Sequence, residues 1–137
     1  MDIHEVQRDI ETIRAVTVGL PRKRDAVYVA LTLIYRTAHK WVECGRAKVL
    51  RDAVIELSGR RIDRRIRRNL FRFLIELGWP DLDIKLRSRY ANALRYAASN
   101  KCPIAELANF MKSKGRIEKC ANRDVARRKK MSTRSEQ

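Results

Sequence analysis

The stretch Gly59–Pro80 reads GRRIDRRIRRNLFRFLIELGWP and combines an arginine cluster with an apolar stripe. Placed at about 100° per residue, six apolar side chains fall within an arc of about 120°: Ile62, Ile66, Leu70, Phe73, Leu74 and Leu77. Seven arginines fall on the other side: Arg60, Arg61, Arg64, Arg65, Arg67, Arg68 and Arg72. Glycine brackets the stretch at both ends, and Pro80 cannot continue a helix because it lacks an N–H. We expect one two-faced helix, with an exposed arginine-rich first half and a second half buried on all sides.

The arginine cluster has few compensating carboxylates. Asp63 and Glu76 are the acidic residues within it, whereas a solvated helix face ordinarily mixes both signs of charge. Clustering like charges costs folding free energy, and the planar fork of arginine fits phosphate. The cluster therefore predicts a polyanionic partner. The alternative is that the arginines keep a small helical protein soluble.

Positive charge is concentrated in the second half of the 137-residue chain. The chain carries 32 Lys and Arg against 16 Asp and Glu, a formal net charge of +16. Residues 1–58 hold ten cations against eight acidic residues, and residues 59–137 hold twenty-two against eight. This balance favours nucleic acid as the partner, with double-stranded DNA ahead of RNA, over an anionic membrane surface. We expect the anion to bind mainly to the second half.

Apolar spacing along the rest of the chain predicts an all-α fold. Helical periodicity is present over residues 2–18, 25–44, 46–58, 84–98, 103–113 and 116–122. With 45% hydrophobic residues, the chain is long enough to bury a core without disulfides or metal. We expect a compact bundle of six to seven helices forming a single domain over residues 1–122. Residues 123–137 are basic and lack apolar periodicity, which predicts a flexible tail.

The first helical segment carries a narrow apolar seam. Ile3, Val6, Ile10 and Ile13 recur at steps of three and four residues. A seam of about two heptads is too short for a long coiled coil. It therefore predicts packing on the domain or, alternatively, against a second copy, which would give a homodimer through residues 2–18.

The segment Ala93–Lys112 can be aligned with a helix-turn-helix pattern. Ala97 would be the small residue of the first helix, Cys102 the buried turn residue, and Leu107 with Phe110 the inward residues of the second. No glycine is present in the turn, and a plain helical hairpin explains the same spacing. If the segment enters a major groove, Asn109 is the candidate for an adenine edge and Lys112 for a phosphate.

Further basic residues flank this segment on both sides. Those expected to contact phosphate are Lys85, Arg87, Arg89, Arg95, Lys114, Arg116 and Lys119. The ARRKK run at residues 126–130 can add contacts, or can be a solvated tail. Trp79, Tyr90 and Tyr96 lie near cations and could stack on unpaired bases, but their spacing also fits core packing.

Catalytic chemistry has little support in the sequence. Acidic residues are scattered, there is no glycine-rich phosphate loop, and neither His4 nor His39 has a neighbour at ligand spacing. We therefore expect no enzyme activity, no cofactor and no metal. The N-terminus resembles no secretory signal, no apolar run approaches about 20 residues, and three separated cysteines fit reduced thiols in the cytoplasm. The sequence thus predicts a small DNA-binding regulator. The alternative is an interaction module or inhibitor that docks on an acidic protein.

Overall fold

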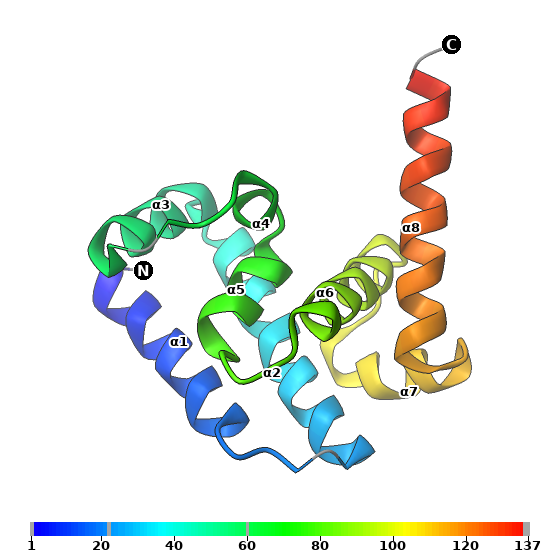
Figure 1. Ribbon diagram of the computed structural model, residues 1–137, viewed down its shortest axis with the longest axis horizontal. Coiled ribbons are helices and arrows are strands. Elements are labelled where there is room, and N and C mark those ends of the chain that lie inside the picture. The colour runs from blue at the N-terminus through cyan, green and yellow to red at the C-terminus, as the bar shows by residue number, and fades with distance from the viewer. Residues whose placement is uncertain (1, 22, 60, 136–137) are drawn as a thin grey trace. The chain divides into compact units, whose positions relative to one another are not determined.

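The described part of the chain consists of helices joined by short connections and contains no strand (Figure 1). The computed structural model describes residues 2–21, 23–59 and 61–135. The helices are α1 (Ile3–Thr17), α2 (Arg24–Glu43), α3 (Ala47–Ser58), α4 (Arg64–Arg68), α5 (Leu70–Gly78), α6 (Ile84–Ser99), the 3-10 helix η1 (Ile104–Glu106), α7 (Leu107–Ser113) and α8 (Arg116–Ser135). The all-α prediction is confirmed. The described residues form eight α-helices, more than the six to seven expected, because one expected helix is two.

Contacts divide the chain into two compact units, Met1–Leu82 and Asp83–Gln137, here called unit 1 and unit 2. Unit 1 contains α1 to α5, and unit 2 contains α6 to α8 with η1. The single domain expected over residues 1–122 stays a prediction, because grouping by contacts does not show whether the two units fold independently.

The core of unit 1 is formed by α1, α2 and α5, which contact one another. Helix α5 buries Phe73, Leu74 and Ile75 in succession. Three consecutive residues point in directions about 100° apart, so α5 is surrounded by other elements. Burial of the second half of the Gly59–Pro80 stretch on all sides is therefore confirmed. Trp41 of α2 is fully buried and lies against Phe73, with ring centroids 6.5 Å apart.

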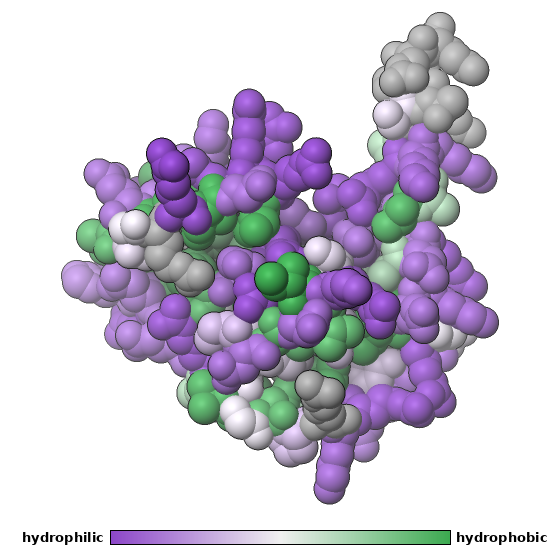
Figure 2. Space-filling model, viewed as in Figure 1, coloured by the Kyte–Doolittle hydropathy of each residue, from purple (hydrophilic) through white to green (hydrophobic). Residues whose placement is uncertain are grey.

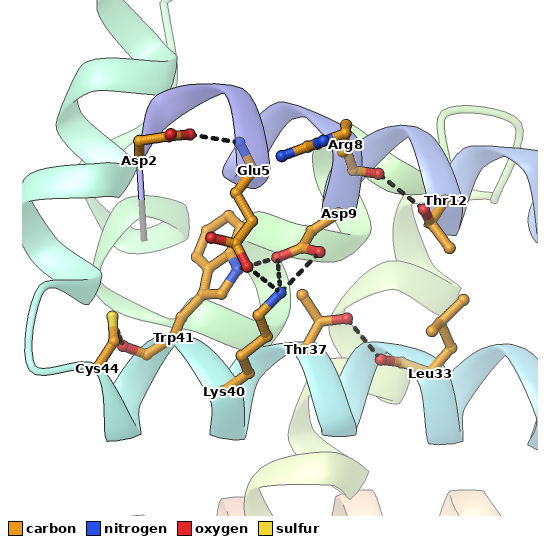
Figure 3. Close-up of polar contacts among 10 residues, drawn as sticks. All are labelled: Asp2, Glu5, Arg8, Asp9, Thr12, Leu33, Thr37, Lys40, Trp41 and Cys44. Carbon is orange, nitrogen blue, oxygen red and sulfur yellow. Dashed lines mark hydrogen bonds and ion pairs between the residues drawn. The ribbon is translucent and has the colours of Figure 1, made fainter.

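Polar contacts fix α1 along α2 (Figure 3). Asp9 accepts hydrogen bonds from Trp41 Nε1 at 2.9 Å and from Lys40 Nζ at 3.1 Å, and Lys40 Nζ lies 3.1 Å from Glu5 Oε1. Burial lowers the pKa of the Lys40 ammonium, but the hydrogen bonds to Glu5 and Asp9 outweigh it, so the pKa is raised. At the start of α1, Asp2 accepts a hydrogen bond from Glu5 N at 2.9 Å and caps the helix.

The apolar seam of α1 is used inside unit 1. Val6 and Ile13 are fully buried and Ile10 is 5% exposed, because α1 packs against α2, α3 and α5. The structure thus agrees with the first expectation for this seam, packing on the domain. A homodimer stays a prediction, and it would have to use side chains other than those of this seam.

The C-terminal end of α5 is held by α1. Arg14 Nε donates to Leu77 O at 2.7 Å, and Thr17 Oγ1 donates to Gly78 O at 2.6 Å. These bonds satisfy carbonyl groups that the end of a helix leaves without an intrahelical partner. Gly78 lies so close to Ile13 that an added Cβ would be 2.5 Å from Ile13 Cγ2. Glycine at this position therefore permits the close approach of the two helices.

The Gly59–Pro80 stretch forms α4 and α5 rather than one helix. Asn69 lies between them in an extended conformation (φ −104°, ψ 102°), and its Oδ1 accepts a hydrogen bond from Arg72 N at 3.3 Å. This bond satisfies a donor in the first turn of α5 that a continuous helix would satisfy itself. The prediction of a single helix is wrong because apolar periodicity does not reveal an N-cap inside the pattern.

Unit 2 is built on the pairing of α6 with α8, and α7 contacts both helices. Helix α8 extends to Ser135, and its C-terminal part projects beyond α7 (Figure 1). The flexible tail expected from residue 123 is therefore not confirmed over the described residues. Residues 136 and 137 of that expected tail lie outside them.

The reason for this difference is a buried carboxylate on α8. Asp124 is fully buried and accepts hydrogen bonds from Arg127 at 3.0 Å and Arg128 at 2.9 Å. Arg128 also donates to Asn92 Oδ1 of α6 at 3.0 Å. An aspartate and an arginine thus occupy positions on the packed side of α8 where apolar residues are usual. The expected apolar periodicity is absent although the helix is packed.

Candidate anion-binding site

The arginines of α4 are presented at the surface of unit 1. Asp63 caps this five-residue helix by accepting a hydrogen bond from Arg65 N at 2.7 Å. Arg64, Arg65 and Arg68 are exposed, and within the described residues they form no ion pair. Figure 2 shows hydrophilic side chains projecting from the region of α3 and α4. The first half of the cluster is therefore exposed, as expected.

A partly open surface pocket of about 480 Å³, here called the α3–α4 pocket, lies between α3 and α4. Its lining combines five cations with one carboxylate and one apolar side chain: Lys48, Arg51, Asp52, Ile62, Arg64, Arg67 and Arg68. Cations from two separate helices thus converge on one space. Such convergence concentrates positive potential more than the same charges spread over a flat surface.

An ion pair links the two walls of the pocket. Arg67 of α4 lies 2.9 Å from Asp52 Oδ1 of α3, and the two side chains are 42% and 45% exposed. An ion pair this exposed contributes about 0–1 kcal/mol to stability. Its main effect is to hold the Arg67 guanidinium beside α3, where it lines the pocket.

Arg51 supplies a buried donor at the pocket. Among the described residues, its Nε is buried and has no hydrogen-bond acceptor. Burial lowers the pKa of the Arg51 guanidinium and the neighbouring Arg67 lowers it further, while Asp52 raises it. A buried guanidinium N–H without an acceptor is costly, and the Arg51 side chain also adds a cation to the lining of the pocket.

The structure divides the seven predicted arginines among different environments. Arg64, Arg67 and Arg68 line the pocket, whereas Arg61 and Arg65 are exposed outside its lining. Arg60 lies outside the described residues.

Arg72 points into unit 1 instead of toward solvent. Its side chain is 11% exposed and lies 3.5 Å from Glu76 Oε2, one turn later on α5. Because α5 is buried on all sides, Arg72 lies in the interior of unit 1, although the sequence pattern places it on the arginine face. Arg72 is therefore not a surface residue that a ligand can reach.

Sequence reasoning missed Lys48 and Arg51 as possible anion ligands. They lie three residues apart on α3, which places them on the same side of that helix. Because the charge balance of residues 1–58 is nearly even, it did not reveal this local pair of cations. The signal that could have found them is their spacing of three residues on a helix that ends immediately before the arginine cluster.

The predicted residues of unit 2 are spread over α6, α7 and α8. Exposed side chains are Lys85, Arg89, Asn109, Lys112, Lys114, Arg116 and Lys119, whereas Arg87 and Arg95 are half-buried. Burial lowers the pKa of Arg95, and the nearby Asp124 raises it. Arg95 thus lies beside the buried carboxylate of unit 2, and its role there is partly structural.

The turn of the expected helix-turn-helix segment has a definite geometry. Lys101 adopts a left-handed conformation (φ 54°), and Lys101 N and Cys102 N donate to Ala98 O and Ala97 O, both at 3.0 Å. This is the Schellman arrangement that usually places glycine where Lys101 stands. Lysine thus takes the place of the missing glycine.

The inward positions of that segment are largely as expected. Ala97, Cys102 and Leu107 are buried, and Phe110 is half-buried against Tyr96 with ring centroids 5.8 Å apart. The second helix begins with the 3-10 turn η1 and continues as the seven-residue α7. Groove docking by Asn109 and Lys112 stays a prediction.

Aromatic side chains offer little surface for stacking. Trp79 is 5% exposed, and Tyr90 and Tyr96 are half-buried. Across the described residues, no tryptophan, tyrosine or phenylalanine is fully exposed. Arg123 Cζ lies 6.0 Å from the Tyr96 ring, so a cation already lies near that ring.

The described residues contain no cluster typical of a metal site, and the comparisons with known proteins do not indicate a function. No group of three His, Cys, Asp or Glu side chains there is placed to hold a metal ion, and no described helix combines the length and apolarity needed to cross a membrane. In comparisons with known proteins, no family model, no curated protein and no solved structure matches the chain. Function is therefore inferred from the side chains themselves.

Proposed function

We propose that the protein binds nucleic acid through its phosphates, with double-stranded DNA favoured over RNA, and acts as a small DNA-binding regulator. The observation that carries the proposal is the α3–α4 pocket, where five cations converge with one carboxylate. Arginine presents its donors in a planar fork that matches two phosphate oxygens at once. Most hydrogen bonds to DNA go to phosphate and sugar, so such a surface is suited to holding a duplex.

The preference for duplex DNA is supported by the burial of the aromatic side chains. Proteins that read single strands stack bases on exposed aromatic rings. Here Trp41, Phe73 and Trp79 are core residues, and the described aromatic side chains outside the core are half-buried. Phosphate contacts along a duplex need no such rings. The three cysteines, all within the described residues, form no disulfide there, which supports the proposed cytoplasmic location.

Exposed cations of unit 2 support the same ligand class. Lys119, Arg123 and Lys130 of α8 are exposed and recur at four and seven residues, so they share one side of the helix. A row of cations on one helix face can follow a phosphate backbone. These residues would add affinity without sequence readout.

The test is a salt-dependent binding titration of the full chain with a labelled DNA duplex. A triple variant, Arg64→Gln with Arg67→Gln and Arg68→Gln, removes the α4 side of the pocket. We expect affinity to fall at least about tenfold, and the slope of log K against log salt to become shallower by about three, one for each phosphate that the variant no longer neutralises. Circular dichroism checks that the helices are retained.

A matched control separates the site from bulk charge. Arg8→Gln with Arg24→Gln and Arg36→Gln removes the same net charge from exposed positions of α1 and α2. We expect this control to lose less than about threefold in affinity, since screened charges away from the bound duplex act weakly. Equal losses in the two triple variants would reduce the case to net charge. Binding to polyglutamate as tight as to the duplex would favour the alternative, an acidic protein partner.

A further inference from the structure

We propose that the α3–α4 pocket binds a compact polyphosphate group, such as a nucleic acid 5′-triphosphate end or the triphosphate of a free nucleotide. The inference rests on the proposed function in taking phosphate as the ligand, and it names the form of phosphate that the pocket would select. A backbone phosphate, as in the proposed duplex complex, would contact only part of the converging cations, so a compact polyphosphate is expected to bind the pocket more tightly, for reasons of charge, space and donor arrangement.

The charge of the pocket exceeds what one backbone phosphate can balance. Five cations and one carboxylate line the space, a formal excess of four positive charges. Each backbone phosphate carries a single negative charge, and a terminal phosphate monoester carries about 1.5 to 2. Several adjoining phosphates are needed to approach neutrality in one pocket. A triphosphate provides them within one short group.

The space of the pocket leads to the same conclusion. A volume of about 480 Å³ is many times the share of one liquid water molecule, which is about 30 Å³. One tetrahedral anion would occupy only part of that space. A chain of two or three phosphates is longer and can contact more of the lining cations.

The donors are placed on both walls of the pocket. Arg64 and Arg68 are one helical turn apart on α4, so they project on the same side. Arg67 is held beside α3 by Asp52 at 2.9 Å. On the opposite wall, Lys48 and Arg51 of α3 line the pocket. An occupant that contacts only α4 would leave these two positive charges without a bound anion.

The experiment is calorimetric titration of the full chain with orthophosphate, pyrophosphate and tripolyphosphate at one ionic strength. We expect tripolyphosphate to bind at least about 30-fold more tightly than orthophosphate, because it contacts more of the converging cations. Equal affinity for the three anions at matched ionic strength would overturn the inference.

Single variants on one helix provide the matched control. Arg68→Gln removes a pocket residue, and Arg65→Gln removes an exposed arginine of α4 that does not line the pocket. We expect tripolyphosphate affinity to fall about tenfold in the first and less than about twofold in the second. Arg51→Gln tests the opposite wall, with circular dichroism as the check on folding. Equal losses for Arg65→Gln and Arg68→Gln would contradict a specific pocket.

Two further arms distinguish the source of the polyphosphate and separate this inference from the proposed function. A 5′-triphosphate duplex that binds at least about tenfold more tightly than the 5′-hydroxyl duplex assigns the pocket to a nucleic acid end, and ATP binding alone assigns it to a free nucleotide. If the 5′-hydroxyl duplex binds with the α4 dependence described above and tripolyphosphate does not bind, the function stands and this inference fails. If tripolyphosphate binds and neither duplex does, the duplex-binding function fails and the pocket assignment stands.

Discussion

Segment 61–68, which includes α4, and segment 123–130, within α8, have similar runs of arginine around one aspartate, but the two aspartates have different roles. In RIDRRIRR, Asp63 caps α4 through Arg65 N, and the arginines are left to face solvent and the α3–α4 pocket. In RDVARRKK, Asp124 is fully buried on α8 and accepts hydrogen bonds from Arg127 and Arg128. The helical position of the carboxylate therefore decides whether nearby arginines are available to a ligand or are engaged in the fold.

The proposed site does not lie in the unit that has the larger net charge. Unit 1 holds 17 Lys and Arg against 11 Asp and Glu, and unit 2 holds 15 against 5. The α3–α4 pocket is in unit 1, which has the smaller excess. Convergence of side chains from two helices raises the local potential, and a charge sum along the sequence does not record it.

The largest effect is expected from the buried carboxylate of unit 2. Asp124→Asn keeps the shape of the side chain but leaves its arginine partners without a counter-charge. Breaking a buried ion pair from one side costs about 3–5 kcal/mol. Because Arg127 and Arg128 are 36% and 39% exposed and can turn to water, we expect a loss of about 2–3 kcal/mol. Urea unfolding measures it.

Glu118→Gln is the control for this prediction, since Glu118 is exposed on the same helix. Its expected effect is within about 0.5 kcal/mol. If Asp124→Asn proved as mild as this control, the buried ion pairs would contribute little to α8, and the contrast with α4 would disappear.

A smaller effect is expected in the rates of thiol alkylation, which can be measured separately for the cysteines of each unit. Cys44 of unit 1 is exposed, whereas Cys102 and Cys120 of unit 2 are buried. Burial raises the pKa of both buried thiols; Glu106 adds to this at Cys102, and Arg123 and Lys114 oppose it at Cys120. Because the thiolate is the reactive form, we expect iodoacetamide to modify them at least about tenfold more slowly than Cys44.

Mass spectrometry of the modified chain gives the three rates. Repeating the measurement in rising urea shows when unit 2 opens, and Asp124→Asn should lower the urea concentration at which Cys102 and Cys120 become reactive. Equal native rates for all three thiols would show that unit 2 opens readily without urea, contrary to its packed core.

The smallest effect on stability is expected from Asp52→Asn in unit 1. The Asp52–Arg67 pair is more than 40% exposed on both sides, so its loss should cost no more than about 0.5 kcal/mol. Removing this carboxylate also removes repulsion of an anion in the pocket, and we expect tripolyphosphate affinity to rise about threefold. Calorimetry and urea unfolding of the same sample check both parts.

The two aspartates thus give a paired test of the comparison. Asp124→Asn should reduce stability, whereas Asp52→Asn should leave stability nearly unchanged and increase anion affinity. A lower anion affinity in Asp52→Asn would mean that holding Arg67 in place matters more than the repulsion that Asp52 exerts.

Much of the fold could be predicted from apolar spacing. The ranges of α1, α2, α3 and α6 agree with the expected segments to within about two residues, the usual uncertainty of helix ends. The interruption at Asn69 could not be predicted in this way, because its cause is a side-chain hydrogen bond to Arg72 N. The length of α8 was missed because Asp124 and Arg128 occupy packed positions, and their partners are unknown until the fold is known.

The candidate site could be predicted in part. The exposure of Arg64, Arg65 and Arg68 follows from the two-faced pattern. Burial of Arg72 against Glu76 does not, because it depends on how α5 is surrounded. The contribution of Arg51 also depends on tertiary structure, since sequence spacing does not specify how α3 and α4 are placed relative to each other.

The single extended residue between α4 and α5 makes unit 1 modular for protein engineering. Asn69 starts α5 with its own cap, so the hydrophobic centre built on Phe73 and Leu74 does not depend on a continuous helix from α4. Libraries that randomise Arg64, Arg65 and Arg68 can therefore explore new ligand preferences while the rest of unit 1 serves as a constant scaffold.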